Sequence, residues 1–281
     1  MSIKIITDRS CDLNKDIIEK YNIDVIPFNI FMDEKCYKDT ELDSKDFYNK
    51  MKASKELPKT SCQSPAVFMP LYDCEEDNVI VFTATSKLTA MYSIAVLGKN
   101  LFEEENNNKR IEIIDTLNGS VGQGLLIIKT IQLIEEDKLT FDEILNEIEI
   151  MKKEIKLYGA LDTLDNAIKG GRMSPLKGKM ANALNLKGLV HVEDGLVIPF
   201  GAVRGENNSL KKVVENILNV AKNKNRDDLI INIGHANCPA KAEKVKDMLT
   251  KEYSFKEVII SEIGPAMGIY TAEGAILVSI L

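Results

Sequence analysis

Three segments in the first half of the chain share a pattern: a short apolar run, then small polar residues, then helical spacing. The apolar runs are residues 3–6, 79–82 and 111–114, and the residues that follow them include Thr, Ser and Asp. Helical periodicity follows over residues 13–21, from about Thr89 and from Gly119. Strands that alternate with helices in this way predict a parallel sheet with helices packed on its faces.

The segments between these units follow other patterns. Residues 25–31 form an apolar run in which Pro27 favours extended backbone. Residues 60–65 read as a polar turn whose Ser64 and Pro65 open a helix. Three further segments have helical spacing, namely 43–51 with Ser44 as its N-cap, a long amphipathic stretch over 144–158, and 161–168.

The second half of the chain predicts a mixed sheet. Residues 193–195, Glu-Asp-Gly, have the signature of a hairpin turn between apolar runs at 189–192 and 196–200. The pattern then predicts helices over 209–222 and 240–253, and strands over 229–233, 258–262 and 274–281. We therefore expect an α/β fold of two lobes: 1–156 with a parallel sheet and flanking helices, and 157–281 with a mixed sheet.

Composition and charge narrow the class of protein. The 281 residues are 44% hydrophobic and 28% charged, as in ordinary globular proteins, and the net charge of -7 disfavours nucleic acid as a partner. Five scattered cysteines without a C-x-x-C pair fit a reducing compartment and no zinc site. The first residues do not resemble a signal peptide, and no apolar stretch is long enough to span a bilayer. We expect a soluble, cytoplasmic protein.

Few residues have the spacing of a catalytic or metal site. The chain has two histidines, and neither has metal-ligand spacing. His191 interrupts an apolar strand and reads as structural, whereas His235 ends a strand, where function and structure are equally good explanations. Asp8 and Asp115 each follow a strand, where Asp serves as a general acid or base or, more often, as a cap. The sequence therefore predicts no catalytic residue and no metal.

Hydroxyl side chains gather at the same predicted sheet edge. Hydroxyls and backbone N–H groups at helix starts suit a carboxylate, although Ser and Thr also cap helices. The hydroxyls are those of Thr60, Ser61, Ser64, Thr83, Thr85, Ser86, Thr89 and Thr116.

Read together, several segments resemble the DegV family of bacterial lipid-binding proteins. The resemblance keeps the order of the family's motifs and covers essentially the whole chain. The matching segments are 5–8 (Ile-Ile-Thr-Asp), 58–61 (Pro-Lys-Thr-Ser), 86–92 (Ser-Lys-Leu-Thr-Ala-Met-Tyr), 114–116 (Ile-Asp-Thr), 161–164 (Leu-Asp-Thr-Leu), 169–172 (Lys-Gly-Gly-Arg), 186–187 (Leu-Lys) with Gly195 and Arg204, and 263–265 (Ile-Gly-Pro).

The resemblance implies two α/β lobes that hold a long-chain fatty acid such as palmitate, without a cofactor. It makes Thr60 the carboxylate anchor and Thr89 a second hydroxyl, and it adds Ser61, Tyr270 and Arg172 as candidate ligand residues. Several members of the family present the acyl group to a separate fatty acid kinase, so we expect such a kinase as a partner. A carrier of this kind needs no catalytic residues of its own.

Three departures from the family's motifs surround the expected anchor. The family's Thr-Ser-Gln-Pro-Ser is Thr-Ser-Cys-Gln-Ser at 60–64, and its Leu-Ser-Gly-Thr-Tyr is Leu-Thr-Ala-Met-Tyr at 88–92. A family His that contacts the carboxylate is Tyr270, whose hydroxyl can also donate. The nearby Glu273 adds a negative charge that Arg9, which replaces a Ser, could offset.

Two other classes of function stay open from the sequence. One is a phosphotransferase or hydrolase that uses Asp8, Asp115 or His235, because the expected fold also resembles part of the dihydroxyacetone kinases. The other is a regulatory module in which the lipid is structural. Lys187 and Arg204 lie outside the apolar pattern and face either a partner or solvent, and Arg172 either holds the turn at 170–171 or reaches the cleft between the lobes.

Overall fold

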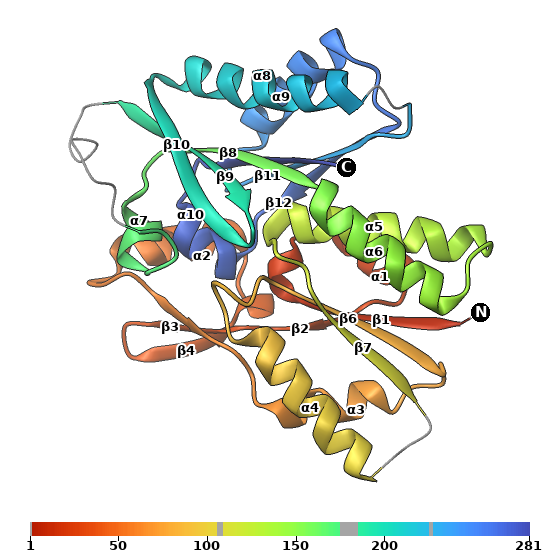
Figure 1. The fold of residues 1–281 in the computed structure, drawn as a ribbon. Helices are drawn as coiled ribbons and strands as arrows, with labels where there is room; N and C mark the ends of the chain where they lie inside the picture. Colours follow the sequence, from red (N-terminus) through yellow and green to blue (C-terminus); the bar gives the residue numbers. More distant parts are fainter. Residues whose placement is uncertain (1, 106–108, 175–184, 225–226) are drawn as a thin grey trace.

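The computed structural model describes residues 2–105, 109–174, 185–224 and 227–281, and its described strands form three sheets (Figure 1). The N-terminal sheet is wholly parallel, in the order β2 (Asp24–Ile26), β1 (Ile3–Asp8), β6 (Asn78–Thr83) and β7 (Arg110–Asp115). This confirms the parallel sheet that the alternation of strands and helices predicts.

The C-terminal sheet has six strands and is mixed. Its order is β10 (Leu196–Arg204), β9 (Leu186–Glu193), β8 (Lys156–Leu161), β13 (Ile276–Ile280), β11 (Ile230–His235) and β12 (Glu257–Glu262). Only β11 and β12 pair in parallel; the other neighbours are antiparallel. A small antiparallel sheet has the order β4 (Lys35–Lys38), β3 (Asn29–Met32) and β5 (Lys59–Ser61).

Helices form three layers around the two large sheets (Figure 1). The outer layers are α3 (Met69–Tyr72) with α4 (Met91–Glu105) on the N-terminal sheet, and α8 (Glu206–Lys224) with α9 (Pro239–Glu252) on the C-terminal sheet. The middle layer is α1 (Lys15–Lys20), α5 (Ser120–Glu136) and α6 (Phe141–Glu154). Shorter elements complete the chain: α2 (Ser44–Ala53), α7 (Asp165–Lys169), α10 (Pro265–Thr271) and the 3-10 turns η1 (Arg9–Cys11), η2 (Asp39–Glu41) and η3 (Pro65–Val67).

Helix α5 packs on both large sheets because it is apolar around most of its circumference. Its first nine residues, Ser120 to Ile128, are all buried. Leucines and isoleucines of α5 share one core with Phe82 of the N-terminal sheet and with Ile230 and Ile259 of the C-terminal sheet. A helix without a polar face is typical of a fully buried position.

The division of the chain into two lobes near residue 157 stays a prediction.

The structure corrects several elements predicted from the sequence. Residues 144–158 are not one helix: α6 ends at Glu154, and β8 begins at Lys156 between β9 and β13. The helix predicted over 161–168 is also wrong, since α7 spans only Asp165–Lys169. Short apolar runs satisfy either period, and here pairing with two neighbouring strands decides for extended backbone.

Two further corrections concern polar positions. Thr60 lies in β5 rather than in a turn, paired with Ile30 of β3. The N-cap of α2 is Asp43, whose carboxylate accepts hydrogen bonds from the backbone N–H groups of Lys45 and Asp46, and not Ser44. The sequence also missed α10, a seven-residue helix that starts with Pro265.

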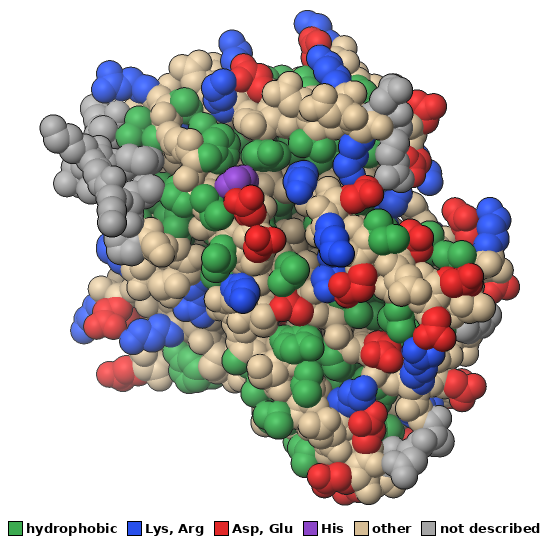
Figure 2. All heavy atoms as spheres, in the orientation of Figure 1, with side chains coloured by type: hydrophobic (Ala, Val, Ile, Leu, Met, Phe, Trp, Pro, Cys, Tyr) green, Lys and Arg blue, Asp and Glu red, His purple; other side chains and the backbone are tan. Residues whose placement is uncertain are grey.

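On the face of the molecule that Figure 2 shows, the charged side chains are dispersed. Figure 2 shows acidic and basic side chains interspersed over one face, with apolar side chains gathered where α4 lies. Leu97 and Leu101 of α4 are among the exposed large apolar residues. In the part of the chain that the structure describes, no helix has both the length and the hydropathy needed to cross a bilayer.

The tip of the hairpin formed by β9 and β10 contacts the loop that follows β6 of the N-terminal sheet. Its turn has Asp194 at φ 47° and Gly195 at φ 80°, as a two-residue turn with positive φ at both central positions requires. A Cβ atom on Gly195 would collide with Thr85 Oγ1, which lies in the loop after β6. The predicted hairpin is confirmed, and its tip touches the opposite sheet's loops.

This close approach predicts the effect of a substitution at the hairpin tip. Gly195→Ala should lower the free energy of unfolding by about 2–3 kcal/mol, because it adds a clash with Thr85 to the strain of positive φ. Gly205→Ala is the matched control: Gly205 has φ 85°, and no atom of the described residues lies within 4 Å of an added Cβ. Gly205→Ala should lower the free energy of unfolding by about 1 kcal/mol. Equal losses for the two variants in urea denaturation would contradict the contact.

Candidate functional site

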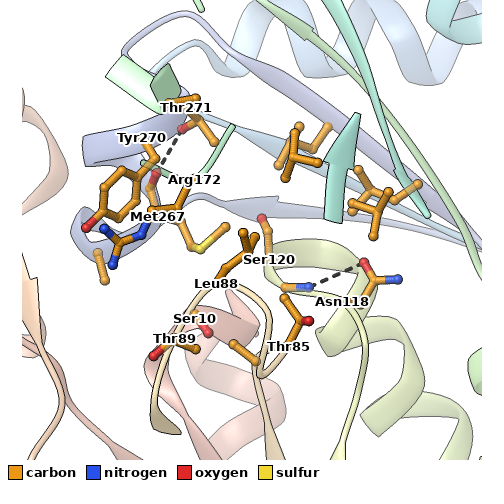
Figure 3. Close-up of a pocket in the computed structure, with 18 of the residues that line it drawn as sticks. Ser10, Thr85, Leu88, Thr89, Asn118, Ser120, Arg172, Met267, Tyr270 and Thr271 are labelled. Carbon is orange, nitrogen blue, oxygen red and sulfur yellow. Dashed lines mark hydrogen bonds between the residues drawn. The ribbon is translucent and has the colours of Figure 1, made fainter. Parts of the chain in front are cut away.

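A cavity lies between the carboxyl edge of the N-terminal sheet and one face of the C-terminal sheet (Figure 3). Its empty volume is about 950 Å³, with open solvent at the mouth included. Most of the wall is apolar, and it comes from both halves of the chain. The apolar wall includes Phe28, Leu88, Leu157, Leu161, Val190, Val192, Val197, Met267 and Leu277.

One end of the cavity carries hydroxyls and a guanidinium group. Thr60 Oγ1 of β5 and Tyr270 Oη of α10 share a hydrogen bond of 2.8 Å, although 210 positions separate them in the chain. The Arg172 guanidinium lies 4.4 Å from the centre of the Tyr270 ring and donates to the carbonyl of Gly170 at 2.6 Å. Arg172 therefore holds the turn and lines the cavity, which joins the two roles that the sequence left open.

Thr89 lies in the turn before α4 and brings a further hydroxyl to the cavity. Its Oγ1 accepts a hydrogen bond from the backbone N–H of Met91 at 3.3 Å. The Cys62 thiol, which directly follows β5, lies 3.3 Å from the same oxygen. The helix predicted from Thr89 thus begins two residues later, and Thr89 has a capping contact.

Three other hydroxyls that line the cavity are already paired with the protein. Ser10 donates to Asp8, Ser120 donates to Asp12 at 2.6 Å, and Thr271 donates to the carbonyl of Met267 at 3.2 Å. A hydroxyl whose proton is used in this way presents little donor capacity to a ligand. Ser10, Ser120 and Thr271 therefore add little polar character to a wall that is otherwise largely apolar.

Four of the five predicted site residues line the cavity, namely Thr60, Thr89, Arg172 and Tyr270. Ser61 is not among the lining residues, because side chains alternate along β5; its hydroxyl accepts a hydrogen bond from Asn29 Nδ2 at 3.4 Å. Among the other predicted hydroxyls, Thr85 lines the cavity, whereas Thr83 and Thr116 are buried and donate to backbone carbonyls.

Sequence reasoning missed Ser10, Asn118, Ser120 and Thr271 as lining residues. Only their closeness to strand ends could have indicated the first three, and α10 was not predicted at all. The valines at 190, 192 and 197 alternate as strand residues do, but the sequence did not show that this face of the hairpin lines a cavity.

The candidate acid–base residues are used structurally and do not line the cavity. The Asp8 carboxylate accepts hydrogen bonds from the backbone of Ser10 at 3.1 Å and of Ala84 at 2.7 Å. Asp115 accepts from the backbone N–H groups of Ser86 and Leu117. Capping, the preferred explanation for both aspartates, is confirmed for Asp8, which is the N-cap of η1. It is wrong for Asp115, since the N-cap of α5 is Gly119 and Asp115 instead holds two loop segments together.

The two histidines lie elsewhere on the C-terminal sheet. His191 stacks with Tyr158 at a ring distance of 6.1 Å and packs against Phe200. His235 is buried at the end of β11, burial lowers its pKa, and its Nδ1 has no hydrogen-bond partner among the described residues. Across residues 2–105, 109–174, 185–224 and 227–281, no group of three or more His, Cys, Asp or Glu side chains could hold a metal ion.

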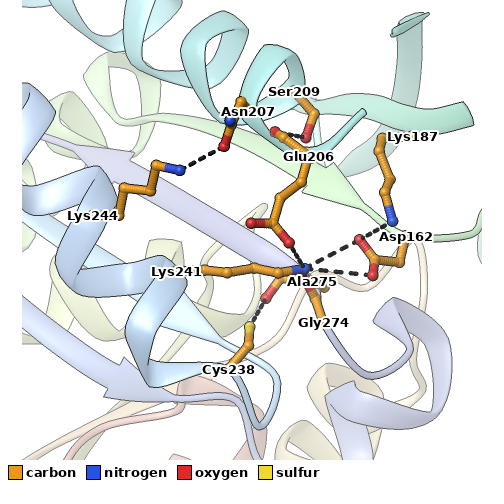
Figure 4. A network of polar contacts seen from close by, with 10 residues as sticks. All are labelled: Asp162, Lys187, Glu206, Asn207, Ser209, Cys238, Lys241, Lys244, Gly274 and Ala275. Carbon is orange, nitrogen blue, oxygen red and sulfur yellow. Dashed lines mark hydrogen bonds and ion pairs between the residues drawn. The ribbon is translucent and has the colours of Figure 1, made fainter. Parts of the chain in front are cut away.

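A network of charges supports the loop that follows α10 (Figure 4). Lys241 lies 3.4 Å from Asp162 and 3.2 Å from Glu206, and it donates to the carbonyl of Gly274 at 3.0 Å. Lys187 also pairs with Asp162, at 2.9 Å, and its side chain is only 15% exposed. Lys187 is therefore mostly enclosed in this network. The sequence had predicted that it faces a partner or solvent.

The charge of Glu273 is compensated by residues other than Arg9. Glu273 pairs with Lys52 of α2 and accepts a hydrogen bond from Asn237 at 2.6 Å, and the contact with Lys52 is the main cause of its lowered pKa. Arg9 instead lies near buried carboxylates, those of Asp12 and Asp39, and its Nη1 has no hydrogen-bond partner among the described residues. The expected compensation by Arg9 is wrong.

The fold and the site define an α/β protein with a largely apolar cavity between two sheets and polar donors at one end of it. A family model described as "Uncharacterised protein, DegV family" matches residues 2–281, and the chain belongs to this family. A DegV domain-containing protein of Clostridium perfringens is 34% identical over 235 residues, 82% of each chain. Protein DegV of Bacillus subtilis is 26% identical over 280 residues, 98% of each chain.

Solved structures of the family have the same fold. A DegV family protein of Ruminococcus gnavus, described with vaccenic acid, matches with a TM-score of 0.92 and 29% identity over 99% of both chains. A fatty acid binding DegV family protein of Streptococcus agalactiae has a TM-score of 0.85 and 27% identity over 100% of this chain and 98% of that one. These likenesses confirm the predicted α/β fold.

The buried aspartates behind the cavity predict a dependence of stability on pH. Burial raises the pKa of Asp12 and of Asp39 to about 7, against the opposing charge of Arg9, from 3.8. Between about pH 4 and pH 7 the folded protein then holds protons that the unfolded chain has released, so stability should fall as the pH rises through this window.

Asp39→Asn removes one of these titrating groups, so the free energy of unfolding should decrease less between pH 5 and pH 7. Urea denaturation at the two pH values would measure this difference. The Asn can still accept the hydrogen bond that Phe28 N–H donates to Asp39 Oδ1 at 3.1 Å. Asp16→Asn, at an exposed carboxylate of α1, is the control and should leave the profile unchanged. A profile for Asp39→Asn that runs parallel to that of the unaltered protein would show the prediction to be wrong.

Proposed function

We propose that this protein binds a long-chain fatty acid in the cavity, in the cytoplasm, without transforming it. The observation that supports this best is the contrast within the cavity between a largely apolar wall and the contacting polar groups of Thr60, Tyr270 and Arg172. Thr89 brings a further hydroxyl to the same cavity. Such a cavity suits a molecule with one anionic end and a long apolar tail. A polar ligand would find few partners along most of the wall.

The energetics of burial favour an acyl chain. Each methylene removed from water contributes about 0.8 kcal/mol, so a long chain supplies on the order of 10 kcal/mol before the costs of binding. The carboxylate must also be paired when it leaves water, because an unpaired buried charge is expensive. A carboxylate that replaces the hydrogen bond between the Thr60 and Tyr270 hydroxyls can accept from both of them, and the Arg172 guanidinium supplies a positive charge beside them.

Presentation of the bound fatty acid to a separate kinase is the second part of the proposal. A Streptococcus pneumoniae structure described as a fatty acid kinase B3 protein loaded with linoleic acid has a TM-score of 0.85, but at 24% identity it shows the fold alone. The support from this chain is that Asp8, Asp115 and His235, the three candidate acid–base residues, are not among the residues that line the cavity. A partner that supplies the chemistry would complement such a carrier.

The ligand itself provides the first test. Protein purified from bacteria should carry an acyl chain, which mass spectrometry of an organic extract would identify, and the delipidated protein should bind a long-chain fatty acid again. Recovery of no lipid, together with no binding after delipidation, would refute the proposed function.

Two near-isosteric variants test the polar end of the cavity. Thr60→Val and Tyr270→Phe each remove one hydroxyl, and the second keeps the ring on which Arg172 lies. Each should raise the Kd for the fatty acid by roughly tenfold or more, as the loss of a hydrogen bond to a charged group predicts. Ser61→Ala is the control, since Ser61 does not line the cavity. Losses as large for Ser61→Ala as for Thr60→Val would contradict the assignment.

A further inference from the structure

The Thr89 hydroxyl lies between a backbone donor and a thiol. Met91 N–H donates to its oxygen at 3.3 Å, and Cys62 Sγ lies 3.3 Å from the same atom. Cys62 follows β5 and Thr89 precedes α4, so this contact joins the two segments that bring hydroxyls to the end of the cavity. Cys62 occupies the position where the resembled family has Gln.

The hydrogen-bond capacity of a hydroxyl limits what Thr89 can offer a ligand. A threonine hydroxyl has one proton to donate and two lone pairs that can accept. Met91 N–H occupies one lone pair. If the Cys62 S–H donates to the second, the hydroxyl proton is left for the cavity, which Thr89 lines. If Thr89 instead donates to the sulfur, the cavity receives only a lone pair, which repels a carboxylate.

The thiol retains the proton that the first arrangement requires. Cys62 is half-buried, and burial raises the pKa of its thiol, although the hydrogen bonds with Thr89 and with the backbone of Ala90 act in the opposite direction. The thiol is therefore protonated at neutral pH and is able to donate. An anionic ligand then selects the arrangement in which Cys62 donates to Thr89 and Thr89 donates to the ligand.

We propose that Cys62 is a positioning residue that makes Thr89 a dedicated donor and so gives the cavity a preference for carboxylate over uncharged head groups. This rests on the proposed function and adds to it the basis of selectivity at the head group. A fatty alcohol both donates and accepts, but it finds both lone pairs of Thr89 occupied. When Cys62 is removed, Thr89 can accept from the alcohol, and the preference weakens.

The quantity to measure is the ratio of the Kd for hexadecanol to the Kd for palmitate, by titration of the delipidated protein. Cys62→Ala should reduce this ratio roughly three- to tenfold, as the loss of one hydrogen bond predicts. Cys62→Ser restores a donor and should stay within about twofold of the unaltered protein. Loss of packing alone would weaken both ligands alike and leave the ratio unchanged.

Two controls test whether Cys62 acts through the Thr89 hydroxyl. Cys74→Ala alters another half-buried thiol, one that donates to the carbonyl of Glu76 at 3.7 Å and does not line the cavity, and should not change the ratio. In a Thr89→Val background, Cys62→Ala should have no further effect on the ratio, because the group through which Cys62 acts is absent.

The outcomes separate this proposal from the proposed function. If the unaltered protein binds both ligands but Cys62→Ala leaves the ratio unchanged, or Cys62→Ser behaves as Cys62→Ala does, the role of Cys62 is refuted and fatty acid binding is retained. If the effect of Cys62→Ala persists in the Thr89→Val background, the role is likewise refuted. If the unaltered protein binds neither ligand, both proposals fail.

Discussion

The burial of α5 between the two large sheets is the constraint on which the rest of the structure depends. The helix has apolar residues around most of its surface, so it is stable only when both sides are covered. One side packs on the N-terminal sheet and the other on the C-terminal sheet. This places the carboxyl edge of the parallel sheet opposite a face of the mixed sheet, and the cavity lies where the two meet.

A cavity built at a sheet edge inherits polar groups that an acyl chain cannot satisfy. Strand ends and helix starts are rich in hydroxyls and backbone N–H groups, because those residues cap helices and close turns. The protein pairs two of them internally: the Ser10 and Ser120 hydroxyls donate hydrogen bonds to the carboxylates of Asp8 and Asp12. The buried carboxylates thus reduce the donor capacity of two hydroxyls on a wall that apolar side chains dominate, and burial raises the pKa of both carboxylates.

The departures from the family's motifs lie at the polar end and are matched by local contacts. Tyr270 bonds to Thr60 and lies under Arg172, so the hydroxyl that replaces an imidazole is held in place from both sides. The negative charge of Glu273 is paired with Lys52, which removes its repulsion from the head-group end. Cys62 lies beside Thr89, where a longer Gln would need different space.

The sequence by itself determined the alternation of strands and helices in the first half of the chain, the parallel N-terminal sheet and the β9–β10 hairpin. Its motifs also indicated Thr60, Thr89, Arg172 and Tyr270, which line one cavity. These depend on local periodicity, turn residues and motif order, which a single chain displays directly. The tertiary structure decided that residues 156–161 form a strand, because two neighbouring strands pair with them. It also decided which hydroxyls face the cavity and which are paired, because that depends on partners such as Asp12 for Ser120, 108 positions away. The contact between Cys62 and Thr89 also depends on the tertiary structure. Neither residue alone indicates it, and only the fold brings the segment after β5 beside the turn before α4.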